Sequence, residues 1–273
     1  MQTTCCAEIR DEALFKDPPA KEDCPICLLP MPMTIISCAS LPAATISSVS
    51  IYDFAIANEE LANEDTEEDY PCCGKSICAG CVHSFRKSGN IDKCSFCNAD
   101  RGSKTDEELV EEVMKRVEAN DANSICMLAN SYHHGVNGLQ RDEERAIELY
   151  ARAADLGHSG SHYQLGVIYH EGGEKAKFHY EAAAMAGHEV ARNTLGYIEF
   201  HSGNMERALK HTMIAASRGN YFAMHSVIIS FEEGGVSRES IDSTLTAYNN
   251  SCAEMRSEER DNYILTRVRT RPI

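Results

Sequence analysis

The stretch AIELYARAADLGH, residues 146–158, decides the fold of most of this chain, because its pattern of small residues returns twice. AKFHYEAAAMAGH begins at Ala176, and ALKHTMIAASRGN begins at Ala208. In all three stretches alanine stands at offsets 0, 7 and 8, and glycine stands at offset 11. On an α-helix these alanines share one face and allow a neighbouring helix to pack closely. The glycine suits the left-handed cap at the end of a helix.

A second helical segment precedes each of these stretches: SICMLANSYHH, SHYQLGVIYHE and ARNTLGYIEFH. Each unit is therefore a helix pair of 30 to 37 residues, which is typical of an α-solenoid. The pattern L-G-x-x-Y followed by A-x-x-x-Y-x-x-A-A-x-x-G is similar to the Sel-one-like repeat, a relative of the tetratricopeptide repeat. This resemblance implies an all-α solenoid of helix-pair repeats whose surface binds a protein or peptide.

The repeats set the expected organisation of the second part of the chain. Thr105 and Glu108 form a capping box, which predicts that a helix begins there. We expect a linker over 101–104, a solenoid over 105–250 and a C-terminal tail over 257–273. Repeats are expected at about 121–158, 159–188 and 189–220, with a degenerate unit at 221–256. Ten histidines fall among these helices, and we expect surface or capping roles for them.

Cysteine marks a different kind of domain before residue 100. Eleven of the thirteen cysteines precede residue 98. Three C-x-x-C pairs and one doublet give eight thiols, enough for two tetrahedral sites: Cys24/Cys27, Cys78/Cys81, Cys94/Cys97 and Cys72-Cys73. Zinc bound to four thiolates needs sulfurs ~3.7 Å apart, and a C-x-x-C turn supplies two of them from one short loop. The sequence therefore predicts two Zn²⁺ ions.

The order of these pairs resembles a RING-type zinc finger over about residues 23–100. The resemblance implies an interleaved cross-brace. In it, Cys24, Cys27, Cys78 and Cys81 hold the first zinc, and Cys72, Cys73, Cys94 and Cys97 hold the second. Lys75 stands where many family members have a ligating histidine, so Cys72 is expected to supply the missing ligand. Cys38 and His83 are rival ligands for that place. We expect a flexible tail over 1–22 and an acidic insertion over about 39–69.

The same resemblance implies a ubiquitin ligase that recruits a ubiquitin-conjugating enzyme. Ile26 matches the usual apolar docking position, and Leu28 and Phe96 are expected to extend that surface. Against this, Asn98 stands where active members often carry arginine, and Ser95 stands where proline is common. Two functional hypotheses therefore stay open: a RING-type ubiquitin ligase without a covalent catalytic residue, and a non-enzymatic scaffold with a structural zinc module.

Composition excludes several other functions. The formal net charge of −16 disfavours non-specific binding to nucleic acid, which depends on clustered lysine and arginine. No apolar run is long enough to span a membrane. The N-terminal residues lack the apolar core of a secretory signal. We therefore expect the protein in the reducing cytoplasm or nucleus, where clustered cysteines serve as metal ligands.

Overall fold

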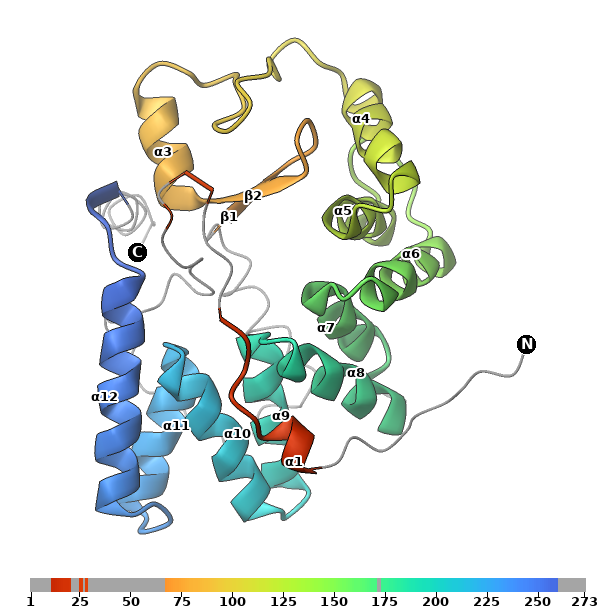
Figure 1. Cartoon of the computed structure of the whole chain (residues 1–273). Coiled ribbons are helices and arrows are strands. Elements are labelled where there is room, and N and C mark those ends of the chain that lie inside the picture. Colours follow the sequence, from red (N-terminus) through yellow and green to blue (C-terminus); the bar gives the residue numbers. More distant parts are fainter. Residues whose placement is uncertain (1–10, 21–24, 27, 29–66, 171–172, 260–273) are drawn as a thin grey trace, which may run out of the picture. The chain divides into compact units, whose positions relative to one another are not determined.

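The structure, a computed structural model, describes residues 11–20, 25–26, 28, 67–170 and 173–259 (Figure 1). The chain falls into two compact units. The thiol unit comprises residues 21–32, 65–161 and 255–273, and the repeat unit comprises residues 1–20, 33–64 and 162–254. The boundary follows Ser161 and falls within one helix, α7 (Ser159–Ile168).

The thiol unit begins with a two-stranded antiparallel sheet. Strand β1 (Glu67–Tyr70) pairs with β2 (Lys75–Cys78) so that Glu67 lies opposite Cys78 and Tyr70 lies opposite Lys75. Helix α3 (Ala79–Lys87) follows β2 directly. Helices α4 (Asp106–Glu118), α5 (Ala122–His134) and α6 (Glu143–Asp155) complete the unit, with α5 packed against both α4 and α6.

Side-chain caps fix where the helices of the thiol unit begin. The predicted capping box is present, because Thr105 accepts from the Glu108 N–H while Glu108 accepts from the Thr105 N–H. Asp121 caps α5, and Asp142 caps α6, each by accepting a backbone N–H three residues later. On α4 the buried stripe is narrower than its apolar pattern, since Met114 remains 49% exposed.

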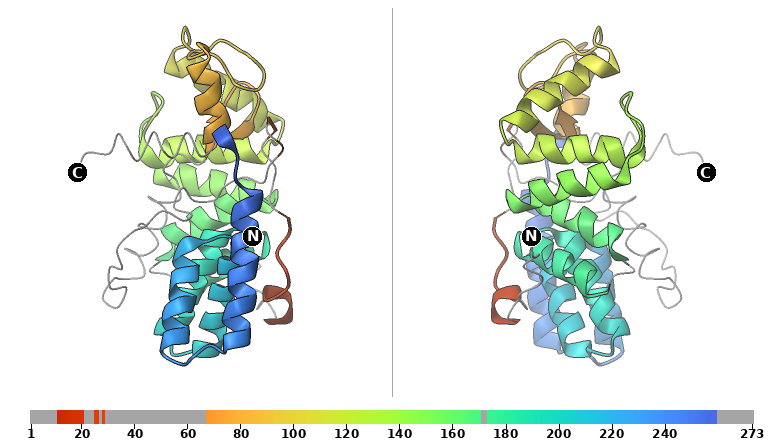
Figure 2. Two further views of the ribbon diagram at one scale, coloured as in Figure 1. Left: turned by 90° about the vertical axis from the view of Figure 1, so that its left-hand side faces the viewer. Right: turned by 90° about the vertical axis from the view of Figure 1, so that its right-hand side faces the viewer.

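The repeat unit consists of paired helices. After α7 come α8 (Glu174–Met185), α9 (Glu189–His201), α10 (Met205–Ser217), α11 (Tyr221–Glu232) and α12 (Arg238–Glu254). Figures 1 and 2 show the blue helix α12 lying alongside α10 and α11, and these three helices pack together. The unit also contains a short N-terminal helix, α1 (Asp11–Leu14), which packs on α8. The solenoid expected from the repeated pattern is thus confirmed.

The alanine stripe behaves as the sequence predicts. Its members are at most 5% exposed: Ala146, Ala153, Ala154, Ala176, Ala183, Ala184, Ala208, Ala215 and Ala216. The glycine three residues after each alanine pair adopts a φ near +90° at Gly157, Gly187 and Gly219. An L-residue with a side chain is strained at that φ, so glycine can end each of these helices without backbone strain.

Glycine has a second use inside two helices of the repeat unit. A Cβ atom added at Gly166 of α7 would lie 2.6 Å from Cε1 of Tyr180 on α8. A Cβ atom added at Gly196 of α9 would lie 2.6 Å from Oγ1 of Thr212 and 3.3 Å from the Ala208 carbonyl oxygen on α10. The Leu-Gly pairs of the repeat therefore mark places where two helices pack too closely for any side chain.

Glu199 and His211 are two of the polar side chains that are buried within the repeat unit. Glu199 on α9 is fully buried and forms ion pairs with Lys177 of α8 at 2.7 Å and with Arg207 of α10 at 3.2 Å. Its carboxylate therefore joins three consecutive helices. His211 on α10 is also fully buried, contrary to the surface or capping role expected for the histidines. The capping role is correct for His158 and His188, which accept N–H groups of Ser161 and Ala191.

Among the described residues, no helix combines the length and the apolar character that a membrane span needs.

Candidate metal centre

The cysteine doublet lies in the turn between β1 and β2. The turn closes where the Cys73 and Gly74 N–H groups donate to the Tyr70 carbonyl oxygen, at 3.2 and 2.8 Å. Gly74 adopts a left-handed φ of +62°, which allows the chain to reverse there. Because the turn holds both cysteines at its tip, their thiols extend from adjacent residues toward a second loop.

That second loop is the C-x-x-C knuckle of Cys94 and Cys97. An isolated bridge between Lys93 and Asp100 closes its base, and the Cys94 N–H donates to the Ala99 carbonyl oxygen at 2.9 Å. Asn98 adopts a left-handed φ of +61°, a conformation that asparagine tolerates better than most residues. The loop therefore turns back on itself within four residues of Cys94.

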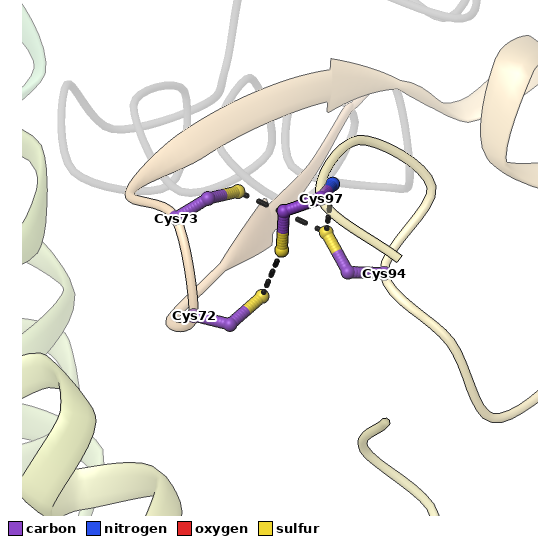
Figure 3. Close-up of side chains that lie close together, drawn as sticks. All are labelled: Cys72, Cys73, Cys94 and Cys97. Carbon is purple, nitrogen blue, oxygen red and sulfur yellow. Dashed lines mark hydrogen bonds between the residues drawn. The ribbon is translucent and has the colours of Figure 1, made fainter. Parts of the chain in front are cut away.

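The four thiols of these two loops meet (Figure 3). Ligand atoms of Cys72, Cys73, Cys94 and Cys97 all lie within 4.8 Å of one another. The Sγ atoms of Cys73 and Cys94 are 3.8 Å apart, and those of Cys72 and Cys97 are 3.4 Å apart. Both distances are far above the ~2.05 Å of a disulfide bond, and all four are free thiols. They are close to the ~3.7 Å separation of two thiolates on one tetrahedral zinc.

Backbone donors in the knuckle favour a thiolate at Cys94. The N–H groups of Phe96 and Cys97 both lie 3.4 Å from the Cys94 Sγ atom. Burial alone would raise the pKa of the Cys94 thiol, but these N–H groups and the neighbouring thiols outweigh burial and lower it. Such donors stabilise negative charge on sulfur, which is the form that binds a metal ion.

The thiols of Cys72 and Cys73, by contrast, are disfavoured as bare anions. Burial raises the pKa of the Cys73 thiol to about 11, although the Lys75 N–H opposes the shift. Burial, followed by the side chains of Cys97 and Cys94, raises the pKa of Cys72 further. A divalent cation at the centre would compensate four crowded negative charges. The donor set, all sulfur and at tetrahedral spacing, fits zinc.

The first predicted site is only partly within the described residues. Cys78 and Cys81 are buried at the junction of β2 and α3, in a core with Tyr70, Ile77 and Val82. Cys24, Cys27 and the rival ligand Cys38 lie outside the described residues. The other rival, His83, is not part of the four-thiol cluster, whereas Cys72 is.

The three residues predicted to bind a partner are accessible. Ile26 is 41% exposed, Leu28 is 72% exposed and Phe96 is 47% exposed. Phe96 lies inside the knuckle, between Cys94 and Cys97 in the sequence. All three apolar side chains are thus exposed in the described part of the chain, as a docking surface would require.

Sequence reasoning missed the contacts that join the two loops. The Tyr70 hydroxyl lies 2.9 Å from the Ser95 hydroxyl, so Ser95, which replaces the common proline, connects the knuckle to β1. The Arg101 guanidinium lies over the Tyr70 ring, 4.6 Å from its centroid. Adjacency of Tyr70 to the doublet was the only signal, and spacing alone did not identify its partners.

The turn of the doublet also packs against α4 and against α5, the first helix of the repeats. Arg116 of α4 donates from Nε to the Pro71 carbonyl oxygen at 3.1 Å and from Nη2 to the Cys72 carbonyl oxygen at 2.8 Å. Asn123 of α5 donates to the Gly74 carbonyl oxygen at 3.3 Å. A Cβ atom at Gly74 would lie 3.0 Å from Asp121, which shows how closely the turn approaches α5. The candidate site and the start of the repeats therefore share one packed interface.

Comparison with known proteins identifies the repeats. The family model described as "Sel1 repeat" matches residues 122–158 and 159–188. An F-box protein of Arabidopsis thaliana is 27% identical over 109 residues, which is 38% of this chain and 31% of that protein. The chain thus matches about a third of the length of this curated relative.

Two solved structures are similar to the chain as well. A protective antigen of uropathogenic Escherichia coli strains, described as displaying an SLR fold, is 19% identical, with a TM-score of 0.44 over 69% of this chain and 43% of that one. A Sel1 repeat protein from Oxalobacter formigenes is 21% identical, with a TM-score of 0.48 over 65% of this chain and 73% of that one. Residues 122–188 of this chain are thus similar to Sel1 repeats.

Proposed function

We propose that this chain is a two-zinc RING-type ubiquitin ligase, which recruits a ubiquitin-conjugating enzyme through the thiol unit and a protein ligand through its Sel1 repeats. One observation carries the proposal: the doublet of one loop and the knuckle of another bring four free thiols within 4.8 Å. That pairing of the doublet with the last C-x-x-C is the one that a RING cross-brace requires. Sel1 repeats form helical scaffolds for protein interactions, which supports the second half of the proposal.

In this proposal zinc has a structural role. Cys72, Cys73, Cys94 and Cys97 would hold one ion, and Cys24, Cys27, Cys78 and Cys81 would hold the other. A site closed by four thiolates leaves no position for a reactive water, so the chemistry supplied is cross-linking of loops and not hydrolysis. The RING-type segment is too small to bury much apolar surface. The binding of metal ions would therefore supply free energy for its folding.

Ligase activity would arise from position alone. The chain would hold a conjugating enzyme, charged with ubiquitin as a thioester, beside a substrate that the repeats bind. Bringing the substrate amine to the thioester replaces a bimolecular encounter with an intramolecular one. Ile26 and Phe96, both exposed, would supply the apolar docking surface.

Self-ubiquitination with a panel of conjugating enzymes tests the ligase proposal. We expect the wild-type chain to form ubiquitin conjugates with at least one enzyme, and Ile26→Ala to reduce the rate at least tenfold. Ile91→Ala is the matched control, because Ile91 is 69% exposed in the same unit and belongs to no predicted surface. Equal rates for wild type and Ile26→Ala would contradict docking through this surface.

A second candidate function is a non-enzymatic scaffold, and two observations favour it. Asn98 occupies the position after the last cysteine in a left-handed conformation, where active RING members often carry arginine. Arg101, the nearest arginine along the chain, lies over the Tyr70 ring. If no enzyme of the panel supports conjugation while the chain binds two zinc ions, the scaffold function is the correct one. Both functions place the protein in a reducing compartment, the cytoplasm or nucleus, where free thiols persist.

A further inference from the structure

The N-terminal segment of the repeat unit, residues 11–19 (DEALFKDPP), lies on helices that are distant from it in sequence. Leu14 is fully buried, whereas Lys16, Asp17 and Pro19 are exposed. The segment thus rests on a few anchoring side chains in the manner of a bound peptide, where a few buried residues supply most of the affinity. The surface beneath it is formed by α8, α9 and α10, the helices of the second and third repeats.

A buried guanidinium holds the main chain of this segment. Arg192 of α9 is only 2% exposed. Its Nη1 atom donates to the Leu14 carbonyl oxygen, and its Nη2 atom donates to the Ala184 carbonyl oxygen at 2.8 Å. Because the segment presents a peptide oxygen to Arg192, any extended or single-turn peptide can make the same hydrogen bond. The contact selects a peptide and not a particular side chain.

Phe15 supplies an aromatic anchor. Its ring lies 4.6 Å from the His211 ring, with Arg207 and Lys210 at 5.5 and 5.6 Å from its centroid. Three nitrogen-bearing side chains of α10 therefore lie close to the Phe15 ring, and the two cations among them favour an electron-rich ring at this position. Pro18 lines a small hollow with Gly187, Ile214 and Arg218, and a Cβ atom added at Gly187 would lie 3.2 Å from Cγ of Pro19.

The segment leaves a buried side chain of the surface that it covers without hydrogen-bond partners. His211 is fully buried, and within the described chain neither of its ring nitrogens has a hydrogen-bond partner. An unmade hydrogen bond in a buried site is costly, so another occupant that reaches these nitrogens gains what the segment forgoes. The hydrogen bond from Arg192 and the burial of Leu14 hold the segment, and its covalent attachment gives it an advantage over a free peptide in competition for this surface.

We propose that residues 11–19 are a displaceable internal ligand, and that the surface of α8, α9 and α10 binds a peptide segment of a partner protein. The partner segment carries an aliphatic residue, an aromatic residue and, three residues beyond the aromatic one, a proline, as in Leu14-Phe15-Lys16-Asp17-Pro18. The proposal rests on the interaction role proposed for the repeats. It is independent of zinc and of ligase activity.

Binding of a labelled peptide in trans tests this proposal. The probe is fluorescein-labelled DEALFKDPPA, measured by fluorescence anisotropy with the full-length chain. We expect Leu14→Ala/Phe15→Ala in the chain to bind the probe at least tenfold tighter than wild type, because the internal competitor is weakened. Lys16→Ala/Asp17→Ala is the matched control, since both side chains are exposed in the same segment, and it should bind the probe as wild type does.

The surface and the peptide are tested separately. Adding Arg192→Met to the double variant should weaken probe binding about tenfold, and a probe with alanine at both the leucine and phenylalanine positions should not bind. Phe15→Ala alone is a second variant for the case that the double variant does not fold. Phe15 is only half-buried, and this substitution leaves Leu14 in place.

Three results would overturn the proposal. The first is a folded Leu14→Ala/Phe15→Ala or Phe15→Ala chain that binds the probe no tighter than wild type. The second is unfolding of both variants by circular dichroism, which would make the segment an integral part of the core. The third is equal binding of the alanine-substituted probe. A loss of ubiquitin transfer with intact peptide binding would instead count against the ligase proposal alone.

Discussion

The Arg116 guanidinium donates to the Cys72 carbonyl oxygen at 2.8 Å and thereby joins helix α4 to the turn that holds the cysteine doublet. A second hydrogen bond from the same side chain reaches the Pro71 carbonyl oxygen at 3.1 Å. The candidate metal site and helix α4, which directly precedes the repeats, are therefore connected through the main chain of the site itself. A change in one of them should alter the stability of the other.

Replacing Arg116 should weaken both the fold and the site. Arg116→Ala removes two charge-assisted hydrogen bonds and leaves two carbonyl oxygens without their donor, which costs about 1–3 kcal/mol. We expect a lower thermal midpoint and, in competition with a chelator, at least a severalfold loss of zinc affinity. Lys115→Ala is the control, because Lys115 is exposed on the same helix and should change neither quantity. Unchanged zinc affinity in folded Arg116→Ala would disprove the coupling.

Gly166 should not tolerate alanine, although alanine favours helices. The gain in helix propensity is about 1 kcal/mol. A Cβ atom 2.6 Å from the Tyr180 ring forces α7 and α8 apart, and such overpacking costs about 1–3 kcal/mol. We therefore expect Gly166→Ala to lower the free energy of unfolding, measured by urea denaturation.

A double-mutant cycle isolates that clash from other effects. Tyr180→Leu removes the ring that the new methyl group would meet. In Gly166→Ala/Tyr180→Leu the loss should be smaller than the sum of the two single losses by about 1 kcal/mol. Strict additivity would show that close packing is not the reason for glycine in the Leu-Gly pair.

His211 should make the repeat unit sensitive to acid. Burial, followed by Arg192 and Arg207, lowers the pKa of His211 to about 3, with Lys177 adding to the shift and Glu199 opposing it. Because the folded pKa lies below the ordinary value near 6.5, the unfolded chain binds more protons between these two values. Stability is therefore fully present above about pH 6.5 and is lost as the pH falls toward 3.

Removing the imidazole should flatten this dependence. Between pH 7 and pH 5 a single such histidine costs up to about 2 kcal/mol of stability. His211→Leu should lose correspondingly less over that interval, measured by urea denaturation at both pH values. The acid sensitivity of Glu199, whose pKa is lowered by its lysine and asparagine partners against the effect of burial, remains in both proteins and serves as the baseline. Parallel losses in the two proteins would exclude His211 as the source.

The sequence was sufficient for features that repeat or that follow local rules. The alanine offsets, the glycine caps and the Thr105 capping box each depend on neighbours within one or two helical turns, and the structure has them. The meeting of Cys72, Cys73, Cys94 and Cys97 followed from the order of cysteine pairs in a resembling family.

Other features depend on which distant residues meet, and no periodicity encodes that. Arg116 resembles any arginine on a helix surface, yet it holds the Pro71-Cys72 turn 45 residues before it. His211 is fully buried, and its ring lies 4.6 Å from the ring of Phe15, which belongs to a segment distant from it in the sequence. The N-terminal segment lacks the repeat pattern, so its sequence did not predict that it packs on the repeat helices.

The zinc content of single-cysteine variants tests the central claim most directly. Native mass spectrometry of the full-length chain should show two zinc ions in wild type, one in Cys72→Ser and two in both Cys38→Ser and Cys126→Ser. Cys126 is buried in α5 outside the cluster, so its variant controls for general loss of a thiol. Two ions retained in Cys72→Ser, or no zinc in the wild-type chain, would contradict the assignment of Cys72, Cys73, Cys94 and Cys97 as a metal centre.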